Sequence, residues 1–449
     1  MQQAKHPTHQ RVAVVGGGWA GLAAAVNCVE LGQQVSLFEA SRQWGGRGRA
    51  LEGPHSGLDN GQHILIGAYR SSLNLMERVG VAPQTVLRSM PLSLRFADGG
   101  GLAVPNWATH WPAPFNILAA IVTAGGWSWA DRFALLRTAS GWQRQGFDCP
   151  AHLTVSDLCQ VLPARVVEEW ADPLCLSALN TPPSTASAAV FLRVLQDAML
   201  GSGWGPWQAA DLLLPTAPLS DLLPSAAVRW LEERGAQVRE GRRILHLRQP
   251  SSPPPDQAWE LDGQVFDRVI LACTATEAAR LCAGAAAPTL HPKTLAALEN
   301  WAQQARSLRY ESIATVYARG PNTLSTAQGH PTSMLALRDG PAQFVFDRGQ
   351  LGGAPGLMAF VVSANQHSLR ELEHLVIAQA EQALGWKHLP IVKTVIEKRA
   401  TFACTPDLAR PPCQIAPGLL AAGDYVAGPY PATLEGAVRS GENAAQLSV

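Results

Sequence analysis

Charged side chains are scarce in this chain of 449 residues: Asp, Glu, Lys and Arg together make up 16%, whereas hydrophobic residues make up 47%. The basic and the acidic side chains balance at 35 each, so the composition gives no electrostatic reason to expect nucleic acid as a partner. The sequence nevertheless contains 14 tryptophans. Low charge with many tryptophans indicates a large apolar interior, an apolar ligand or a membrane surface, and composition leaves these alternatives open.

Cysteine motifs and long apolar runs are also lacking. The eight cysteines form no Cys-x-x-Cys pair and no pairing with histidine at metal-ligand spacing, so no metal site is expected. We interpret them as reduced, mostly buried thiols of a cytoplasmic protein. The polar start, MQQAKHPTHQ, lacks the apolar core of a secretory signal. The longest apolar segment, FNILAAIVTAGGWSW at 115–129, is shorter than the roughly 20 residues that cross a bilayer, which predicts a buried or interfacial helix.

The first 40 residues predict a strand, a helix and a second strand. RVAVVGGG is a β-branched run that ends in glycines, WAGLAAAVNCVELG is a helix closed by Gly32, and QQVSLFEA is the second strand. A right-handed crossover between two parallel strands follows from this order. Further along, AWELDGQVFDRVILAC predicts a hairpin turned on Asp262-Gly263, after a Pro/Ser loop at 250–256.

The turn between the first strand and helix carries the pattern Gly16-x-Gly18-x-x-Gly21. In a nucleotide-binding turn, Gly16 permits the sharp bend, Gly18 lets a pyrophosphate approach the backbone, and Gly21 lets helix and strand pack closely. The helix N-terminus offers N–H groups and partial positive charge to the phosphates. Glu39, at the end of the second strand, can accept a ribose hydroxyl. This context, rather than the three glycines alone, predicts a nucleotide site.

Two further motifs favour FAD over NAD. Trp44-Gly45-Gly46-Arg47-Gly48-Arg49 places two guanidiniums after the second strand, where Arg47 or Arg49 can neutralise a pyrophosphate. Near the other end of the chain, Gly423-Asp424 follows the strand LLAA, and Asp424 can hold the ribityl hydroxyls of a flavin. Residues 431–435, PATLE, then open a helix whose N-terminus can stabilise negative charge on a reduced flavin ring. Nucleotide motifs at both ends fit FAD across a folded-back domain.

Several segments resemble a known superfamily. GGGWAGLAAA, FEASRQWGGRGRA and AAGDY…LEGAVRSGENAA are similar to the FAD-dependent amine oxidase/phytoene desaturase superfamily. More narrowly, LDNGQHILIGAY together with GDYVAGPYPATLEGAVRSG resembles the squalene-associated flavoproteins, the bacterial hydroxysqualene dehydroxylases of hopanoid biosynthesis. The superfamily resemblance covers about the first 70 and the last 50 residues strongly, and VREGRRILHL and VFDRVILAC weakly.

The resemblance implies an α/β fold: a glutathione-reductase-like FAD-binding Rossmann domain with an interleaved, mixed α+β substrate domain and a helical insertion. The FAD-binding domain is expected in three parts, at 1–85, 216–290 and 401–449. The substrate domain is expected in two, at 86–215, where Trp, Pro and Leu are frequent and helices predominate, and at 291–400.

Carried over by position, the superfamily pattern also implies a set of cofactor contacts. The contacts to FAD are expected from Gly16, Gly18, Trp19, Ala20, Gly21, Glu39, Ala40, Gly46, Arg47, Gly61, Gln62, Ile244, Gly423, Asp424, Thr433 and Leu434. Among them, Gly61 and Gln62 would lie beneath the flavin, and Ile244 would touch the adenine by its main chain.

The stretch LDNGQHIL at 58–65 has two interpretations, a site of proton chemistry or a tight loop under the cofactor. Asp59 and His63 are the candidate catalytic residues. Asp59 is interpreted more readily as an acceptor that fixes the loop, and His63 as the candidate proton donor, because its pKa lies near working pH.

The reaction that the resemblance implies is replacement of the hydroxyl of hydroxysqualene, a linear allylic C30 alcohol, by hydrogen to give squalene. A desaturase of a C30 or C40 hydrocarbon and a non-catalytic lipid-binding partner remain alternatives, and an amine substrate is doubtful. The apolar polyprenyl substrate needs a long apolar tunnel, and a separate electron donor is expected because no second Gly-x-Gly-x-x-Gly marks an NAD(P)H domain. The Trp-rich middle is either ordinary core or a peripheral contact with the cytoplasmic face of the inner membrane.

Overall fold

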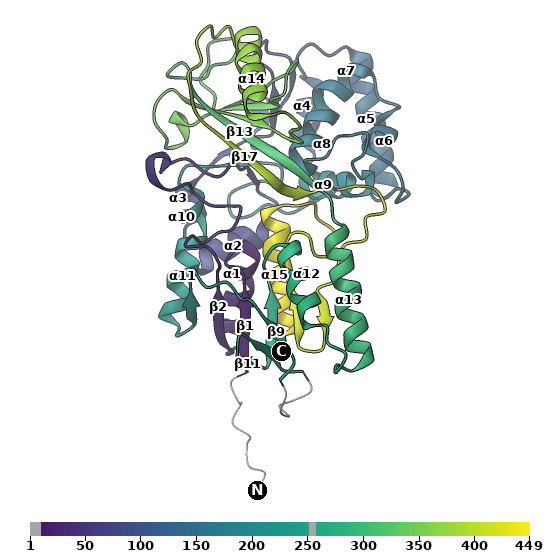
Figure 1. Ribbon diagram of the computed structural model, residues 1–449. Coiled ribbons are helices and arrows are strands. Elements are labelled where there is room, and N and C mark those ends of the chain that lie inside the picture. Colours follow the sequence, from purple (N-terminus) through teal and green to yellow (C-terminus); the bar gives the residue numbers. More distant parts are fainter. Residues whose placement is uncertain (1–9, 251–256) are drawn as a thin grey trace.

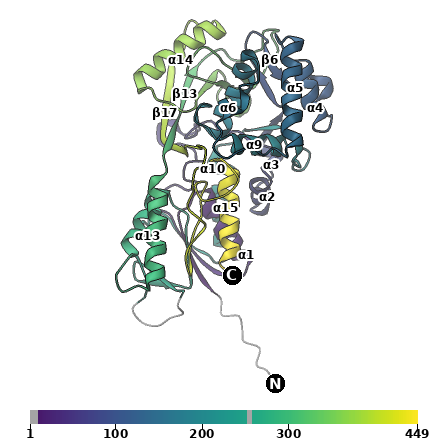
Figure 2. The same cartoon turned by 90° about the vertical axis from the view of Figure 1, so that its right-hand side faces the viewer.

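The computed structural model describes residues 10–250 and 257–449. Figure 1 shows two stacked halves, with the C-terminus in the lower half and the helix α14 at the top of the upper one. The N-terminal segment 1–9 and most of the predicted Pro/Ser loop, 251–256, lie outside the described residues. Seen from the side, the long helix α15 runs up the lower half beside α1 (Figure 2).

The lower half is organised around a six-stranded sheet with the strand order β18-β19-β12-β1-β2-β8. Four neighbouring pairs are parallel, and only β18 runs antiparallel to its neighbour β19. The predicted strand–helix–strand unit is confirmed, because β1 and β2 pair in parallel on either side of α1 in sequence. The strands are β1 (Arg11–Val15), β2 (Gln34–Phe38), β8 (Gln237–Arg239), β12 (Arg268–Leu271), β18 (Gln414–Ala416) and β19 (Leu419–Ala421).

Two helices from opposite ends of the sequence pack together on this sheet, α1 (Trp19–Glu30) and α15 (Leu434–Leu447). Gly441 sets their separation, because a Cβ atom there would lie 2.2 Å from the Ala20 carbonyl oxygen. Gly21 packs α1 closely on the turn that precedes it, where a Cβ atom would lie 1.8 Å from the Gly16 carbonyl oxygen. Helix α1 ends where the sequence predicted: Leu31 is its C-cap, and Gly32 follows with φ +80°.

Other elements complete the lower half. Its helices are α2 (Arg70–Arg78), α3 (Pro83–Val86), α10 (Leu219–Leu222), α11 (Pro224–Glu233), α12 (Ala275–Ala285) and α13 (Pro292–Ser307), with the short turn η1 (Gly53–His55). A three-stranded sheet contains β9 (Leu247–Arg248), β10 (Trp259–Leu261) and β11 (Gln264–Phe266). The predicted hairpin is confirmed: β10 and β11 are antiparallel, with Asp262 (φ 45°) and Gly263 (φ 87°) in the turn. Helix α13 packs on α12, so it belongs to this half although it follows the predicted boundary at residue 290.

The upper half contains a five-stranded antiparallel sheet in the order β14-β15-β16-β13-β17. Its strands are β13 (Tyr310–Arg319), β14 (Met334–Ala336), β15 (Phe344–Asp347), β16 (Leu357–Val362) and β17 (Ile391–Phe402), with the turn η4 (Gly349–Leu351) after β15. Helix α14 (Leu369–Leu384) packs near β17, and it begins with a capping box between Ser368 and Glu371 and ends at Gly385, at φ +71°.

Most of the helical insertion stands beside this sheet (Figure 1). Its helices are η2 (Asn106–Ala108), α4 (Phe115–Val122), α5 (Trp129–Arg144), α6 (Val155–Cys159), α7 (Ala164–Val166), the π-helical turn η3 (Val167–Ala171), α8 (Asp172–Leu179) and α9 (Ala188–Leu200). Short strands connect it to the rest: β3 (Leu65–Ile66), β4 (Leu87–Met90) and β7 (Leu212–Pro215) in one sheet, and β5 (Ser93–Arg95) and β6 (Gly101–Ala103) in another.

The apolar segment 115–129 was predicted as one helix, and that extent is wrong. Helix α4 ends at Val122, because Gly125 forms an isolated β-bridge with Gly101 and Gly126 takes φ +75°. Within 10–250 and 257–449, no helix is long and apolar enough to cross a membrane. All eight cysteines are free thiols and five of them are buried, as predicted.

Candidate functional site

A cavity of about 660 Å³ lies where the two halves of the molecule meet. Its walls come from the carboxyl ends of β1 and β2, the N-termini of α1 and α15, and strands of the five-stranded sheet. The volume falls in the range of small-molecule and cofactor sites.

The structure brings nearly all of the predicted cofactor residues together around this one cavity. Those lining it are Gly16, Gly18, Trp19, Ala20, Glu39, Ala40, Gly46, Arg47, Gly61, Gln62, Ile244, Gly423, Asp424, Thr433 and Leu434, and the candidate acid His63 lines it too. Gly21 and Asp59 do not line it. Gly21 instead provides the close helix–turn packing described above.

The glycine turn forms the end of the cavity where the sequence predicted phosphate contacts. Gly16 takes φ +117°, which side chains rarely adopt, and a Cβ there would lie 2.5 Å from the Ala272 carbonyl oxygen. Gly18 caps α1, so the first N–H groups of that helix point at the cavity. The Glu39 carboxylate is oriented by the N–H groups of Gly17 and Ser41, both at 2.7 Å. This arrangement is suited to an anionic group followed by a hydroxyl-bearing sugar.

Two glycines test whether a bound cofactor fits. At Gly18 the nearest atom to an added Cβ is the Gly46 Cα at 3.8 Å, and at Gly61 it is Thr315 Oγ1 at 3.6 Å. Neither position has a positive φ. No protein atom therefore requires glycine at these two places, whereas a group lying in the cavity against the backbone does. The residues present fit such a group.

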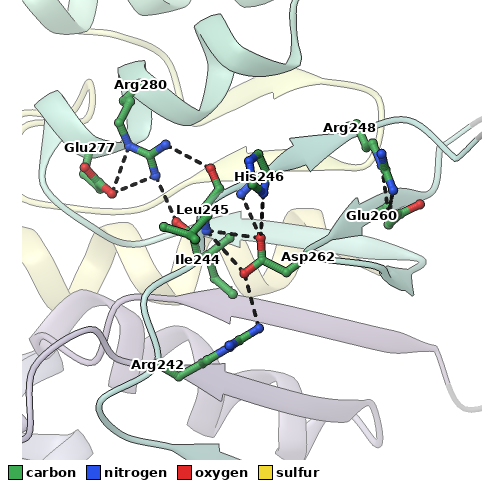
Figure 3. A network of polar contacts seen from close by, with 9 residues as sticks. All are labelled: Arg242, Ile244, Leu245, His246, Arg248, Glu260, Asp262, Glu277 and Arg280. Carbon is green, nitrogen blue, oxygen red and sulfur yellow. Dashed lines mark hydrogen bonds and ion pairs between the residues drawn. The ribbon is translucent and has the colours of Figure 1, made fainter.

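The segment around Ile244 is held rigidly at the edge of the cavity (Figure 3). Arg280 donates to the main-chain carbonyls of Ile244 and Leu245, at 2.9 Å each. Asp262 accepts from the Leu245 N–H at 3.2 Å, and Glu277 pairs with Arg280 at 2.8 Å. The main-chain carbonyl of Ile244 is thus already bonded to a guanidinium, and its buried side chain lines the cavity.

Arg47 and Asp424, predicted for pyrophosphate and ribityl contacts respectively, bind one another. Arg47 Nη2 and Asp424 Oδ1 are 2.6 Å apart, and the Asp424 side chain is 8% exposed. Arg47 also donates to the carbonyl of Ala400 on β17. This ion pair joins the N-terminal loop, the C-terminal loop and the upper sheet. The neighbouring Arg49 donates to the Gly46 carbonyl and to Gln43.

Helix α15 begins at the cavity opposite α1. Thr433 is its N-cap, and its hydroxyl accepts from the Gly436 N–H at 3.0 Å. Glu435, in the first turn, faces away from this end and accepts from the N–H groups of Ser71 and Ser72. The positive end of the α15 dipole is therefore directed at the part of the cavity near Leu434.

His63 lies in the cavity wall with a defined tautomer. Its Nδ1 is 2.9 Å from the Gly61 carbonyl, which only accepts, so Nδ1 carries a proton and Nε2 is the remaining acceptor nitrogen. Burial lowers the pKa of His63 below its ordinary value, although the Gly61 carbonyl and the nearby Asp59 oppose this. A neutral imidazole is the favoured form.

Asp59 is engaged away from the cavity. Its carboxylate accepts from the Leu219 N–H at 2.9 Å and lies 3.6 Å from Arg348, with both side chains of the pair 4% exposed. Burial raises the pKa of Asp59, while Leu219 and Arg348 act in the opposite direction. The geometry favours the interpretation that Asp59 fixes the loop over the interpretation that it is the catalytic proton donor.

Arg348 is a site residue that the sequence did not reveal. It also donates to the Gln62 side-chain oxygen at 3.2 Å and to the Pro215 carbonyl at 3.3 Å. A lone arginine after the strand FVFD carries no motif, and its three acceptors come from distant parts of the chain. Only the fold identifies Arg348 as the residue that positions Gln62 and Asp59.

The upper wall of the cavity was also missed. Its apolar part is formed by Ala178, Ile313, Phe344, Phe346 and Val361, and its polar part includes Ser177, Asn180, Ser363, Arg399 and Thr401. The alternation in FVFD places both phenylalanines on one face of β15, which sequence can predict. That this face meets a cavity depends on where the sheet sits. One carboxylate of the upper sheet, Glu397, reaches the cavity and accepts from Asn60 at 3.3 Å.

Comparison with known proteins agrees with this architecture. The model of the family described as flavin containing amine oxidoreductase matches residues 19–447. The chain is 26% identical over 465 residues to the hydroxysqualene dehydroxylase of Sinorhizobium fredii, with 98% of each chain covered. It is 34% identical over 125 residues to the zeta-carotene desaturase of Synechocystis, covering 28% of this chain and 25% of that protein. The solved cyclohexylamine oxidase of Brevibacterium oxydans superposes with a TM-score of 0.65 over 98% of both chains at 15% identity, a likeness that shows the fold alone.

The fold, the paired helix N-termini and the cavity between them define a flavin-dependent oxidoreductase. The expected fold class, a Rossmann-type nucleotide domain with an interleaved substrate domain, is confirmed. More particularly, the chain belongs to the flavin containing amine oxidoreductase family. The non-catalytic alternative is therefore set aside.

A first prediction concerns Gly18 and Gly61, the two cavity-lining glycines at which an added Cβ would not collide with any protein atom. Gly18→Ala and Gly61→Ala should fold normally but lose flavin affinity by about 10- to 100-fold, because the added methyl occupies space that only the cofactor uses. Flavin absorbance per protein, with the melting temperature, measures this. Gly141→Ala is the matched control, since its Cβ meets nothing within 4 Å and it lies on α5 away from the cavity. Unchanged flavin content in both Gly18→Ala and Gly61→Ala would contradict the inference that the cofactor lies against these two glycines.

A second prediction separates structure from chemistry at Asp59. Asp59→Ala should lower the free energy of unfolding by about 3–5 kcal/mol, because it leaves the Arg348 guanidinium buried without its carboxylate. Adding Arg348→Met should recover much of this loss, which urea unfolding of the two single variants and the double variant measures. A stable Asp59→Ala protein with abolished turnover would instead assign Asp59 to the chemistry.

Proposed function

We propose that the chain is an FAD-dependent reductase of a linear polyprenyl allylic alcohol, hydroxysqualene, which it converts to squalene. The observation that carries this proposal is one continuous cavity that has a polar end at the N-termini of α1 and α15 and a group of apolar side chains, with Phe344 and Phe346, in its upper wall. Similarity to hydroxysqualene dehydroxylases along 98% of both chains supports the particular substrate.

The proposed cofactor contacts follow the order of groups along FAD. Glu39 would hold the adenosine ribose, and the backbone of Ile244 would lie against the adenine. The N–H groups that open α1 would bind the pyrophosphate, together with Arg47. Asp424 would hold the ribityl chain. Gly61, Gln62 and the amides of Thr433 and Leu434 would surround the ring.

When bound in reduced form, the flavin supplies a hydride to the allylic carbon framework of the substrate. The chain's own residues do the rest. Phe344, Phe346 and their apolar neighbours would align the hydrocarbon and exclude water from it. Hydroxide is a poor leaving group, so a proton must reach the departing oxygen. Carbon–oxygen cleavage, one hydride and one proton then give squalene and water, and a separate donor replaces the two electrons.

His63 is the proposed proton donor. With Nδ1 bonded to the Gly61 carbonyl, Nε2 is the nitrogen that would carry the transferred proton. Its lowered pKa makes the imidazolium a stronger acid but a scarcer one at neutral pH. A cytoplasmic location, inferred from the free thiols, belongs to the same proposal.

A desaturase of a C30 or C40 hydrocarbon is the second candidate. The 34% identity to a zeta-carotene desaturase favours it locally, although that match spans only 28% of the chain. The two reactions use the same cavity with opposite electron flow, so the direction of turnover distinguishes them.

A third prediction tests the reaction. Protein reduced under anaerobic conditions should be reoxidised when hydroxysqualene is added and should release one squalene per flavin, because the substrate accepts the hydride. Flavin absorbance and product chromatography measure this. Squalene or phytoene given to the oxidised protein with an electron acceptor is the companion assay. New conjugated double bonds there, with no squalene formed in the first assay, would establish the desaturase instead.

A fourth prediction uses the pKa of His63. If the imidazolium donates the proton, turnover should rise as the pH falls below about 6.5 toward the lowered folded value, because the protonated fraction grows. Protein stability should decrease in the same window, since the unfolded chain binds this proton more readily than the folded one. His63→Gln should flatten both profiles. A His63→Ala variant with normal FAD content and normal turnover would remove His63 from the mechanism.

A further inference from the structure

Exposed aromatic side chains are concentrated in one part of the helical insertion. Of the fourteen large hydrophobic side chains that are exposed in the described chain, seven come from residues 107–133, and they include every exposed Trp and Phe of that set. We call them the aromatic surface: Trp107, Trp111, Phe115, Leu118, Val122, Trp129 and Phe133. Single exposed apolar residues are ordinary, but a group of this kind marks an interaction site.

The aromatic surface lies on η2 and the residues that follow it, on α4 and on α5, and α4 packs against both η2 and α5. Phe115, Leu118 and Val122 follow the spacing i, i+3, i+7 and so share one face of α4. The opposite face is buried, with Ile117 and Ile121 at 7% and 4% exposure. Helix α4 therefore has two apolar faces, and the protein's own core covers only one of them.

Ring contacts connect two pairs of the exposed side chains. Trp107 and Trp111 have ring centroids 5.0 Å apart, and Trp129 and Phe133 have centroids 6.1 Å apart. Trp129 and Phe133 are nevertheless 60% and 64% exposed. Each pair of rings therefore exposes a large apolar area to solvent.

Basic side chains outnumber acidic ones in the segment that carries the aromatic surface. Between residues 105 and 145 the sequence has three arginines, Arg132, Arg137 and Arg144, and a single carboxylate, Asp131. Asp131 is occupied as the acceptor of the Ser128 N–H and hydroxyl, at 2.8 Å each. The Arg132 guanidinium lies 4.8 Å from the Trp129 ring centroid. Aromatic rings bordered by guanidiniums match the apolar edge and the negative headgroups of an anionic bilayer.

We propose that the aromatic surface on η2, α4 and α5 docks the protein on an anionic lipid bilayer. Tryptophan prefers the headgroup level of a membrane, and arginine is attracted to its negative surface. A second copy of this chain fits less well, because a two-fold contact would place the surface against itself and bring its arginines together. Docking rests in part on the proposed function, since a polyprenyl substrate dissolves in the bilayer and not in water.

Flotation with lipid vesicles tests the docking. The wild-type protein should float with vesicles of phosphatidylcholine that contain phosphatidylglycerol, float less with phosphatidylcholine alone, and lose part of its binding in high salt. The combined variant Trp107→Ser/Phe115→Ser/Trp129→Ser should partition at least about tenfold less, since each aromatic ring that leaves water contributes on that scale. Val161→Ser/Leu200→Ser/Leu369→Ser is the matched control, because these three exposed residues lie outside the aromatic surface and outside the cavity lining, and it should bind like the wild type.

Three outcomes would overturn the docking: wild-type protein that stays unbound, an aromatic variant that floats equally well, or wild-type dimers that the aromatic variant dissociates in light scattering. Turnover of hydroxysqualene dispersed in detergent is measured in parallel, and both combined variants should match the wild type there. Because that assay contains no bilayer, a failure of the proposed reaction and a failure of docking are read out separately.

Discussion

Three backbone segments lie in direct contact beneath the cavity, because glycines leave no side chains between them. Gly16 meets the carbonyl of Ala272 after β12, Gly21 meets Gly16, and Gly441 meets Ala20. These contacts draw the first helix, the central strand and the last helix to one point. As a result, α1 and α15 both begin at the same cavity, and two helix dipoles contribute positive potential to it. A methyl group at any of these glycines would separate the elements that form the nucleotide end.

The upper half completes the site through ion pairs, in addition to a hydrophobic cluster that continues from Val15 and Phe38 of the lower sheet to Phe344 and Phe346 of the upper one. Arg348, beside the five-stranded sheet, reaches Asp59 and Gln62, and Arg47 reaches Asp424 and the carbonyl of Ala400. Burying such an ion pair costs free energy, and separating its partners inside the protein costs more. The pairs therefore define one relative position of the two halves. The apolar wall with Phe344 and Phe346 is thereby held opposite the nucleotide turn. The proposed hydride transfer needs the apolar wall to stay fixed opposite the nucleotide turn, because its rate depends on how the substrate is oriented toward the cofactor.

Much of this arrangement could be predicted from local sequence. The glycine turn, Glu39, the helix end at Gly32 and the hairpin on Asp262-Gly263 depend on short-range backbone chemistry, and each has a recognisable residue pattern. The helix expected at 115–129 failed for a non-local reason: Gly125 bridges to Gly101, and this contact with a distant strand ends α4 early. The sequence alone could not distinguish a loop-fixing role of Asp59 from a role as proton donor, because its partners Leu219 and Arg348 come from distant parts of the chain.

The sequence by itself determined the nucleotide-binding fold, because this feature resides in glycine positions and strand–helix order. It also predicted a flavin-type cofactor region at both chain ends and the residues that would form it. Tertiary structure decided which residues face the cavity from the upper sheet and that Arg348 positions Gln62. It also decided that Trp107, Phe115 and Trp129 are exposed to solvent whereas Trp127 is buried. Each of these depends on segments separated by tens to hundreds of residues. The same tryptophans suit a core or a surface, and only the packing of α4 against its neighbours distinguishes the two.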